Sequence, residues 1–415
     1  MGFIPKVGND NRAVSYSQAF NALRKRAHGK RNVAVSKRTG SITSKTKISS
    51  RSFSSKATLR SQRKVDTRTP SQLKTIVNLS ESQQVFHSLI RRGTISTEAK
   101  AVYSAALVIL SEVSRCKDFS AANIQKAIKI GLKQAATTTG LKGSVDFFKE
   151  CEDGGAYNYN DKGQKKTTNG FPKPNREECY LICNNLGFKT NEEVKHPQNL
   201  GELKIDLESC QEANTEKTYK FKDGNGKEVP NLKITCPKDF NIESYSGQLQ
   251  REIDTFNGNV TIYKLKPGTV LTRVFGQDQS IMSSCWCNSI HPDSVVTQAK
   301  DLYQNLAVMP HWNGDSNLGF LIVPNDIEIY VTEGTIASQT TNYSNFSTNT
   351  NGKEIKTDHT YVFQGGSIQL NILTPNNNSH FAGVENNEIF TQIMFTFRND
   401  KIVNPIELAK PKEQK

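Results

Sequence analysis

The spacing of apolar residues changes along the chain and sets a helical part apart from the rest. Between residues 78 and 150, apolar positions recur every three to four residues, which is typical of amphipathic helices. Three helices are predicted there, starting at Ser80, Ser96 and Ser120, because a serine hydroxyl can accept a hydrogen bond from the first turn of a helix. Three short helices of this kind predict a small bundle or a collar.

Residues 241–415 show a different pattern, in which short apolar runs alternate with turn residues. Such runs predict strands, and two helices are expected among them, over 243–256 and from Asp293 to Leu306. The stretch 338–352 is rich in Asn, Thr and Ser and predicts a loop. Many strands with only two helices favour a compact α+β domain built on packed antiparallel sheets. The predicted strands are 260–265, 269–275, 280–286, 319–323, 327–331, 359–363, 367–373 and 390–397.

Two further parts of the chain follow neither pattern. Residues 1–77 are largely Ser, Thr, Lys and Arg, a composition that cannot offset the entropy of ordering the chain, so a disordered basic tail is predicted. Residues 151–240 are polar and irregular and contain four cysteines between 179 and 236, which predicts a small, loosely packed module. The predicted domains are therefore 78–150, 151–240 and 241–415, preceded by the tail.

Charge is concentrated in the tail. The whole chain carries a formal net charge of +14, and residues 1–75 hold 18 Lys and Arg against two acids, a charge of +16 that leaves the remaining 340 residues at −2. If this tail attaches to nucleic acid or to an acidic partner, the binding should be independent of sequence and sensitive to salt. A solvated tail without a partner and an Arg- and Ser-rich targeting segment are the alternatives. The lysine face of the third predicted helix is either solvated or a binding surface; its lysines are Lys126, Lys129 and Lys133.

The eight cysteines do not by themselves indicate a metal site or a disulfide framework. The pairs Cys179/Cys183 and Cys285/Cys287 lack the partners of a standard zinc site, so no metal is expected, and disulfides in an oxidising compartment stay an alternative. No apolar run reaches the eighteen or so residues that cross a membrane, so no membrane span is predicted. The N-terminus lacks the apolar segment of a signal peptide, so export would use another route.

Arg273 stands out within a predicted strand because its neighbours in 269–275 are mostly apolar. Burying an unpaired guanidinium costs several kcal/mol, so this side chain either leaves at the rim of a sheet or binds an anion. A phosphate or pyrophosphate suits its two-pronged donor geometry. A strand-end Arg that faces solvent or a carboxylate is the alternative.

Three segments, in this order, resemble those of one family. They are Y-K-L-K-P-G-T-V-L-T-R-V-F-G (263–276), E-G-T-I-A-S-Q (333–339) and G-G-S-I-Q-L (365–370). This succession resembles the ADP-ribosyltransferase-like toxins, especially the NAD glycohydrolases of the tuberculosis necrotizing toxin type. The resemblance covers about residues 259–400, a third of the chain. The chain departs from the family at Ser338, where Pro is usual, and at Ser367, where Gly is usual.

The resemblance implies an ADP-ribosyltransferase-like fold over 241–415, with NAD as the substrate. Arg273 would hold the pyrophosphate or the adjacent ribose, and Gln369 would orient the nicotinamide ribose while the N-glycosidic bond breaks through an oxocarbenium-like transition state. Phe275 or Trp286 would stack on nicotinamide, and the glycines would let the backbone approach the ligand. The full set of implied NAD-binding positions is Arg273, Phe275, Ser283, Ser284, Trp286, Gly365 and Gly366.

Residues 259–400, which carry the resemblance, lack the E-x-E pair of the arginine-modifying transferases, which favours hydrolysis of NAD or transfer to another acceptor. The leading hypothesis is an effector or toxin that cleaves the nicotinamide–ribose bond and that an immunity or chaperone protein would bind. A non-enzymatic nucleic-acid-associated or virion protein, a cysteine-linked secreted binding module and an inactive descendant of the fold are the alternatives. Whether Arg273 and Gln369 meet in one cleft discriminates among them.

Overall fold

The structure is a computed structural model that describes residues 69–145, 173–188, 203–276, 285–312, 314, 317–373, 392–399 and 401–411. These residues all belong to one compact unit, Asp66–Lys415. The predicted tail lies outside the described residues up to position 68.

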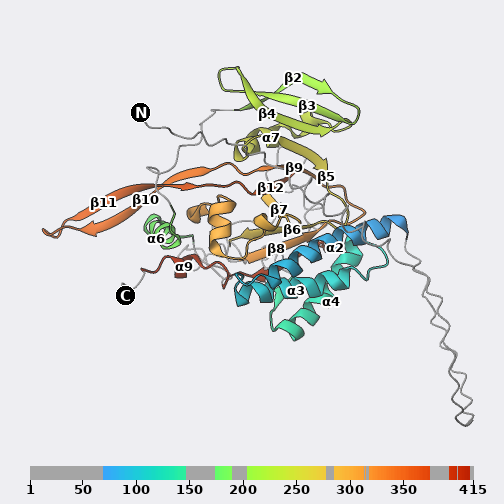
Figure 1. Ribbon diagram of the computed structural model, residues 1–415, viewed down its shortest axis with the longest axis horizontal. Helices are drawn as coiled ribbons and strands as arrows, with labels where there is room; N and C mark the ends of the chain where they lie inside the picture. Colours follow the sequence, from blue (N-terminus) through green and yellow to red (C-terminus); the bar gives the residue numbers. More distant parts are fainter. Residues whose placement is uncertain are drawn as a thin grey trace, which may run out of the picture. The chain divides into compact units, whose positions relative to one another are not determined.

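In the described part of the chain, eleven strands form one hydrogen-bonded sheet (Figure 1). The strands are β1 (Gly143–Ser144), β2 (Lys204–Glu212), β3 (Glu216–Lys222), β4 (Glu228–Pro237), β5 (Val260–Lys264), β6 (Val270–Phe275), β7 (Cys285–Asn288), β8 (Asn317–Ile322), β9 (Tyr330–Thr335), β12 (Ile368–Ile372) and β13 (Met394–Arg398). Their order across the sheet is β1-β13-β8-β6-β7-β12-β9-β5-β4-β3-β2. Within this set only β4 and β5 pair in parallel. The predicted α+β class is therefore confirmed, and the large sheet is antiparallel-rich.

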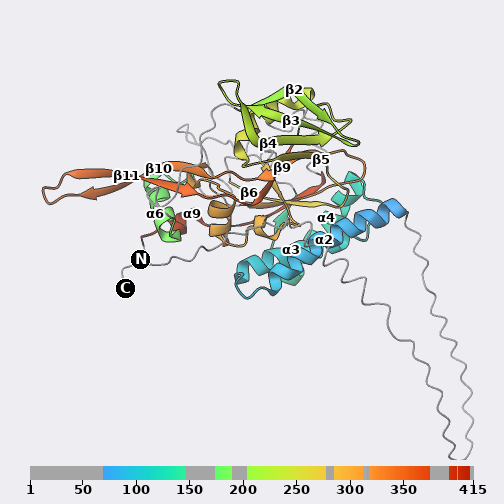
Figure 2. The same cartoon turned by 45° about the horizontal axis from the view of Figure 1, so that its top comes forward.

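A long hairpin replaces the loop predicted at 338–352. Strands β10 (Gln339–Thr348) and β11 (Glu354–Phe363) pair antiparallel along their whole length and extend away from the sheet (Figures 1 and 2). The prediction was wrong because polar side chains support this ladder across its strands. Ser344 Oγ donates to Asp358 Oδ1 at 2.7 Å, and Thr360 Oγ1 donates to Asn342 Oδ1 at 2.6 Å.

The three predicted helices are present, and further short helices accompany them. The helices are α2 (Pro70–Arg91), α3 (Thr97–Val113), α4 (Ala121–Thr139), α6 (Arg176–Leu186), α7 (Ser246–Glu252) and α9 (Pro405–Leu408). The predicted start of the first helix at Ser80 was wrong, because α2 begins ten residues earlier. Thr69 caps α2 in a capping box with Gln72, and Pro70 occupies its first turn, where a missing N–H costs nothing.

Helix α4 takes its cap from a distant part of the chain. Ser120 occupies the predicted cap position, but its side chain makes no capping hydrogen bond. The Asp326 carboxylate accepts from the Ala121 N–H instead, at 3.0 and 3.2 Å. Asn325 N also donates to the Phe119 carbonyl at 2.9 Å, so the turn after β8 fixes the start of α4.

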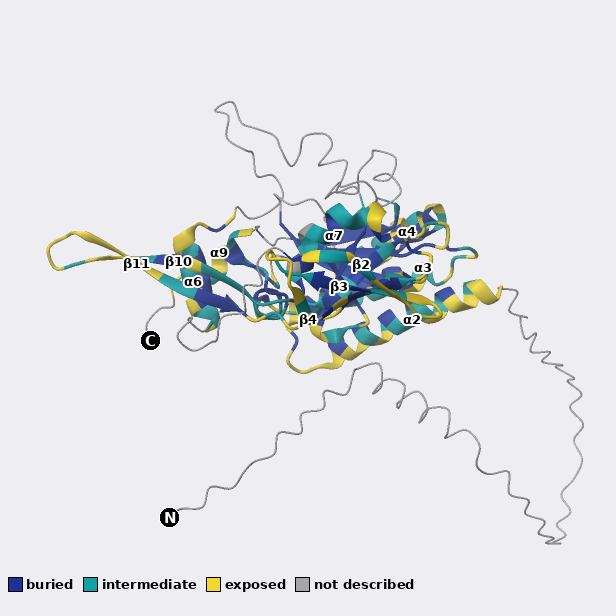
Figure 3. Cartoon of the chain, turned by 90° about the horizontal axis from the view of Figure 1, so that it is seen from above, coloured by how far each residue is buried: buried dark blue, intermediate teal, exposed yellow. Residues whose placement is uncertain are grey.

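Helices α2, α3 and α4 share one hydrophobic core with the sheet. The rings of Phe86 and Tyr103 lie 5.9 and 6.2 Å from that of Phe320 on β8, and Phe320 stacks on Phe395 of β13 at 4.8 Å. Every residue of β8 is buried. Figure 3 shows α2 with buried, intermediate and exposed positions following one another along the helix, as an amphipathic helix requires. The predicted separation of 78–150 from 241–415 therefore falls inside a shared core, because the apolar faces of these helices are covered by the sheet.

The polar segment before residue 241 also joins the main sheet. Strand β4 pairs with β5 through Ile234–Val260 and Thr235–Thr261, so β2, β3 and β4 extend the sheet at its edge. Helix α6, which the sequence analysis did not predict, begins with a capping box between Asn175 and Glu178. That spacing was the available signal for it.

The helix predicted from Asp293 to Leu306 was also wrong. A 3-10 turn (Pro292–Ser294) and a π turn (Asp301–Asn305) stand there instead. The Asp301 carboxylate accepts from Thr297 N at 3.0 Å and from its hydroxyl at 2.7 Å, which holds the backbone in a non-helical conformation. Tyr103 OH on α3 donates to the Val296 carbonyl at 2.5 Å and ties this segment to the helices.

The Pro267–Gly268 turn before β6 is the docking point of α2. Gly268 has φ +84°, and Asn78 Nδ2 donates to the Pro267 carbonyl at 2.7 Å. A Cβ at Gly268 would lie 2.2 Å from the Thr75 carbonyl oxygen, so the helix backbone approaches closer than any side chain permits.

Candidate functional site

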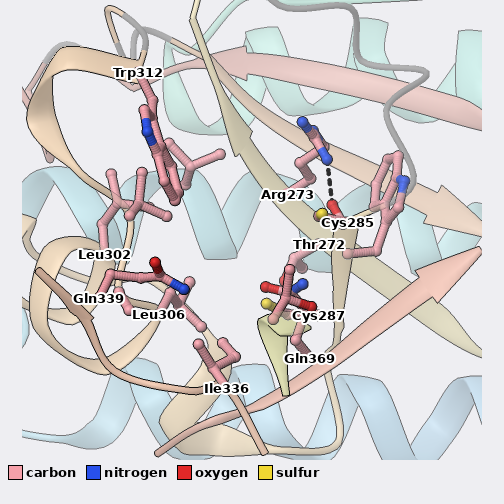
Figure 4. Close-up of a pocket in the computed structure, with 15 residues that line it drawn as sticks. Thr272, Arg273, Cys285, Cys287, Leu302, Leu306, Trp312, Ile336, Gln339 and Gln369 are labelled. Atoms are coloured by element: carbon pink, nitrogen blue, oxygen red, sulfur yellow. Dashed lines mark hydrogen bonds between the residues drawn. The ribbon is translucent and has the colours of Figure 1, made fainter. Parts of the chain in front are cut away.

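A cavity of about 170 Å³ lies where strands β6 and β7 part. These two strands pair only at Leu271–Asn288 and Thr272–Cys287. The first two residues of β7, Cys285 and Trp286, pair with β12 on the other edge of the strand and not with β6. A gap is therefore left between these two residues and β6. One wall of the cavity comes from β6, β7 and β12, and the other from residues 302–312 and the start of β10 (Figure 4).

Arg273 is the first residue of β6 beyond its last pair with β7, and it lines the cavity. The side chain is buried, with a relative exposure of 8%. Its Nη1 donates to the carbonyl oxygen of Cys285 across the gap (Figure 4). The alternative of a solvent-facing Arg is therefore wrong, and the cation is instead held inside the protein between two strands.

Gln369 lies on β12 and lines the same cavity as Arg273. Its Cα pairs with that of Gly334 on β9, and its Nε2 donates to Asn371 Oδ1 at 2.9 Å. Arg273 and Gln369, which are far apart in the sequence, thus line one cavity. This is the arrangement expected if both contact the same ligand.

The aromatic residues predicted to bind NAD occupy different places. Trp286 lines the cavity but is almost fully buried. Phe275 is fully buried in the core shared with the helices and is not among the cavity-lining residues. Ser283 and Ser284 lie outside the described residues.

Gly365 and Gly366 do not line the cavity, and Gly365 packs against protein backbone. Gly365 has φ +67°, and a Cβ there would lie 2.5 Å from the Ile336 carbonyl oxygen. Gly366 N donates to that same carbonyl at 2.9 Å, and Gly365 N donates to Gln304 O at 2.8 Å. The two glycines therefore join the second and third sequence motifs and deliver the chain into β12.

The opposite wall contains residues that the sequence analysis missed. Trp312 lines the cavity with 38% of its surface exposed, and Leu302, Leu306 and Gln339 lie beside it (Figure 4). These residues were missed because 293–306 was predicted as a regular helix and 338–352 as a loop. Trp312 itself could have been found as one of only two tryptophans in the chain.

The His311 ring packs against Trp312. Its Nδ1 is joined to Tyr343 OH at 2.8 Å, and its ring centroid lies 6.3 Å from that of Trp312 in an edge-on arrangement. Burial lowers the pKa of His311, and the positive charges of Arg176 and Lys173 lower it further. A neutral imidazole therefore lies edge-on to the tryptophan that lines the cavity.

The Cys287 thiol in the wall is a buried, protonated group. Burial raises the pKa of Cys287 to about 12, although the charge of Arg273 opposes the shift. Cys285 and the other cysteines of the described segments form no disulfide with one another. In the same segments, no three His, Cys, Asp or Glu side chains converge as metal ligands would.

Glu333, in the second motif, is at the centre of a separate polar network. Tyr263 OH donates to Glu333 Oε2 at 2.5 Å, and His291 Nε2 lies 3.7 Å from the same oxygen. Burial alone would raise the pKa of this carboxyl, but the nearby His291 imidazole and the hydrogen bond from Tyr263 hold it below its ordinary value of 4.5. The carboxylate is therefore ionised at neutral pH and joins β5, β9 and the turn after β7.

We expect Glu333 to stabilise the fold at neutral pH and to lose this effect in acid. A folded-state pKa below the unfolded one gives stability that is complete above pH 4.5 and disappears as the pH falls through the folded value. The difference in unfolding free energy between the wild type and Glu333→Gln should therefore shrink between about pH 7 and pH 3 in urea titrations. Glu328→Gln, an exposed carboxylate paired with Lys264, is the control. A difference that stays constant over this range would contradict the assignment.

In comparisons with known proteins, the chain matches no protein family, no curated protein and no solved structure. None of the helices in the described ranges is long and apolar enough to cross a membrane.

Proposed function

We propose that the protein cleaves the bond between nicotinamide and ribose in NAD, as the resemblance of its three motifs to NAD glycohydrolases implies. One observation carries the proposal: Arg273 and Gln369, the two residues named from those motifs, line the same cavity. A buried cation beside a polar amide, facing an exposed tryptophan, suits a ligand that combines phosphate, ribose and a flat ring.

The size of the cavity restricts how NAD would bind. Pockets that enclose a drug-sized ligand span about 300–1,000 Å³. A cavity of about 170 Å³ would hold the nicotinamide end, with Trp312 against the ring and the remainder of the dinucleotide outside. Arg273 would then contact the pyrophosphate as it leaves the cavity, because a guanidinium can donate to two phosphate oxygens at once.

The reaction breaks the bond between ribose C1′ and the nicotinamide nitrogen. The bonding electron pair leaves with nicotinamide, and an oxocarbenium-like ribose forms. Water then attacks C1′ and releases a proton, which gives ADP-ribose; another acceptor in place of water would give a transfer product. Gln369 would assist by accepting a hydrogen bond from a ribose hydroxyl, whose position it would fix as charge develops.

The experiment is an assay of nicotinamide release from NAD by the full-length protein, followed by chromatography. Released nicotinamide with free ADP-ribose supports hydrolysis, and ADP-ribose bound to protein or nucleic acid supports transfer. Arg273→Lys keeps the charge but loses the two-pronged geometry, so KM should rise about tenfold, equivalent to one charge-assisted hydrogen bond. No release by the wild type over a range of NAD concentrations would refute the proposal.

Destroying NAD harms the cell in which it occurs, so the same proposal gives the protein a role as an effector or toxin. Its producer would then need an immunity or chaperone protein that covers the cavity. If that immunity or chaperone protein is co-expressed and purified with this chain, the complex should release less nicotinamide than the isolated protein. Release at the rate of the isolated protein would argue against that partner.

Binding to nucleic acid is a second candidate function, and the exposed face of α4 favours it. Lys126, Lys129 and Lys133 are all exposed, and α4 contains no acidic residue. Residues 69–145 contain ten Lys and Arg against four acids, so the positive charge extends from the tail into the folded helices. Evenly spaced cations on one helix face can contact successive phosphates.

Replacing Lys126, Lys129 and Lys133 by Glu should weaken binding of the full-length protein to duplex DNA. Each lost phosphate contact removes about 0.9 from the slope of log affinity against log salt, so the slope should fall by about 2–3. Fluorescence anisotropy at several salt concentrations measures it. The matched control replaces three exposed lysines of β2 and β4 and the turn before β4, Lys204, Lys227 and Lys233. Equal slopes for the two triple variants would exclude α4 as the contact.

A further inference from the structure

Gln369 has a fixed partner directly below the cavity wall. Gln369 and Asn371 are two positions apart on β12, so their side chains lie on the same face of the strand. Gln369 Nε2 donates to Asn371 Oδ1 at 2.9 Å. Asn371 is fully buried and is flanked in the sheet by Cys285 on β7 and Thr332 on β9.

This hydrogen bond decides which end of the Gln369 amide faces the cavity. The nitrogen and oxygen of a primary amide point in diverging directions and have nearly the same size, so either end could occupy either place. Because Nε2 is directed at Asn371, Oε1 points away from it. Gln369 lines the cavity and Asn371 does not, so the end turned toward the ligand is a hydrogen-bond acceptor.

The rest of the Asn371 side chain argues for a role beyond stability. Among the described residues, its Nδ2 is buried with no hydrogen-bond partner. Burying such a donor without a partner is unfavourable, and an apolar side chain of the same shape would avoid that cost. An asparagine here is therefore unfavourable for packing alone, and its useful group is the oxygen that Gln369 contacts.

We propose that Asn371 is a positioning residue that holds the Gln369 carbonyl oxygen toward the cavity, where it accepts a hydrogen bond from a ligand hydroxyl. The inference rests on the proposed function, because a ribose supplies the hydroxyl. It narrows the substrate class to nucleotides whose ribose carries a hydroxyl donor within reach of Gln369. Asn371 acts through Gln369 and does not itself contact the substrate.

The first test is the kinetics of Asn371→Leu, which has a similar shape and no acceptor. Misplacing one group at the reacting centre can cost about 100-fold, so kcat for nicotinamide release should fall by about 10- to 100-fold. KM should change much less, because the phosphate contact is intact. The melting temperature should stay level or rise, since the unpaired donor is gone. Thr332→Val is the control, because the buried Thr332 hydroxyl donates to the Asn371 backbone carbonyl at 3.4 Å and not to its side chain.

Two further measurements distinguish positioning from a general structural role. In a Gln369→Ala background, Asn371→Leu should have no additional effect on kcat, whereas independent effects would multiply. In 1H–15N correlation NMR spectra of the full-length protein, the Gln369 side-chain amide protons should exchange slowly with solvent in the wild type. They should exchange much faster in Asn371→Leu.

The outcomes separate this inference from the proposed function. An active wild type with unchanged kcat in Asn371→Leu would overturn the inference and leave the proposed function standing. An inactive wild type would refute the proposed function, and the exchange of the Gln369 amide would still decide whether Asn371 fixes it. Equal exchange in both proteins would refute the positioning.

Discussion

Replacing Gln369 by alanine should lower kcat for nicotinamide release by about 100- to 1,000-fold, which is the usual cost of removing one oriented polar group from a transition state. The side chain is partly buried in the wall formed by β12, and it meets Arg273 in one cavity. Its amide would stabilise the ribose as charge develops. Binding of intact NAD depends mainly on contacts elsewhere, so KM should change little.

Single-turnover and steady-state measurements of nicotinamide release distinguish these effects. Gln211→Ala, which removes an exposed glutamine from the edge strand β2, is the matched control. Circular dichroism of both variants should match the wild type, because neither change leaves a cavity in the core. A Gln369→Ala protein that retains wild-type kcat would remove Gln369 from the mechanism.

Replacing Gly268 by alanine should destabilise the protein by about 2–6 kcal/mol, the sum of a strained left-handed backbone and a forced contact. The added Cβ would lie 2.2 Å from the Thr75 carbonyl oxygen. Because that oxygen belongs to helix backbone, it can move only if α2 shifts from the sheet. The change should therefore loosen the docking of α2 as well as the turn itself.

Gly226 provides the matched control for Gly268. It has a similar φ of +79°, and a Cβ there would meet nothing within 4 Å. Gly226→Ala therefore carries the backbone strain alone, and the difference between the two variants measures the contact with α2. Urea unfolding gives both free energies. Equal losses would show that α2 does not press on the turn, and faster hydrogen exchange in α2 of Gly268→Ala would support the contact.

The sequence predicted those elements whose stability is local. Strands at 260–265, 269–275, 319–323 and 367–373 correspond to β5, β6, β8 and β12, because alternating or fully apolar runs have one favourable way to be buried. Helix α3 begins after the predicted cap, where Ser96 Oγ accepts from Ala99 N at 3.1 Å. These signals lie within a few residues of one another.

Elements that depend on distant partners were predicted poorly. The segment from Asp293 to Leu306 has helical spacing, but Asp301 binds the backbone before it and Tyr103 holds it from α3. The hairpin β10–β11 looked like a loop because its hydrogen-bonding side chains meet only after the strands pair. In each case the tertiary contacts outweighed the local preference.

The sequence by itself determined the α+β class, most of the central strands and the choice of Arg273 and Gln369 as residues worth locating. Only the tertiary structure decided that the two line one cavity, that Trp312 faces them and that Asn371 accepts a hydrogen bond from the glutamine. It also decided that the helices form one core with the sheet. The physical reason is range: caps, turns and periodicity act between neighbours in the chain, whereas a cavity is defined by which distant strands pair and where that pairing ends.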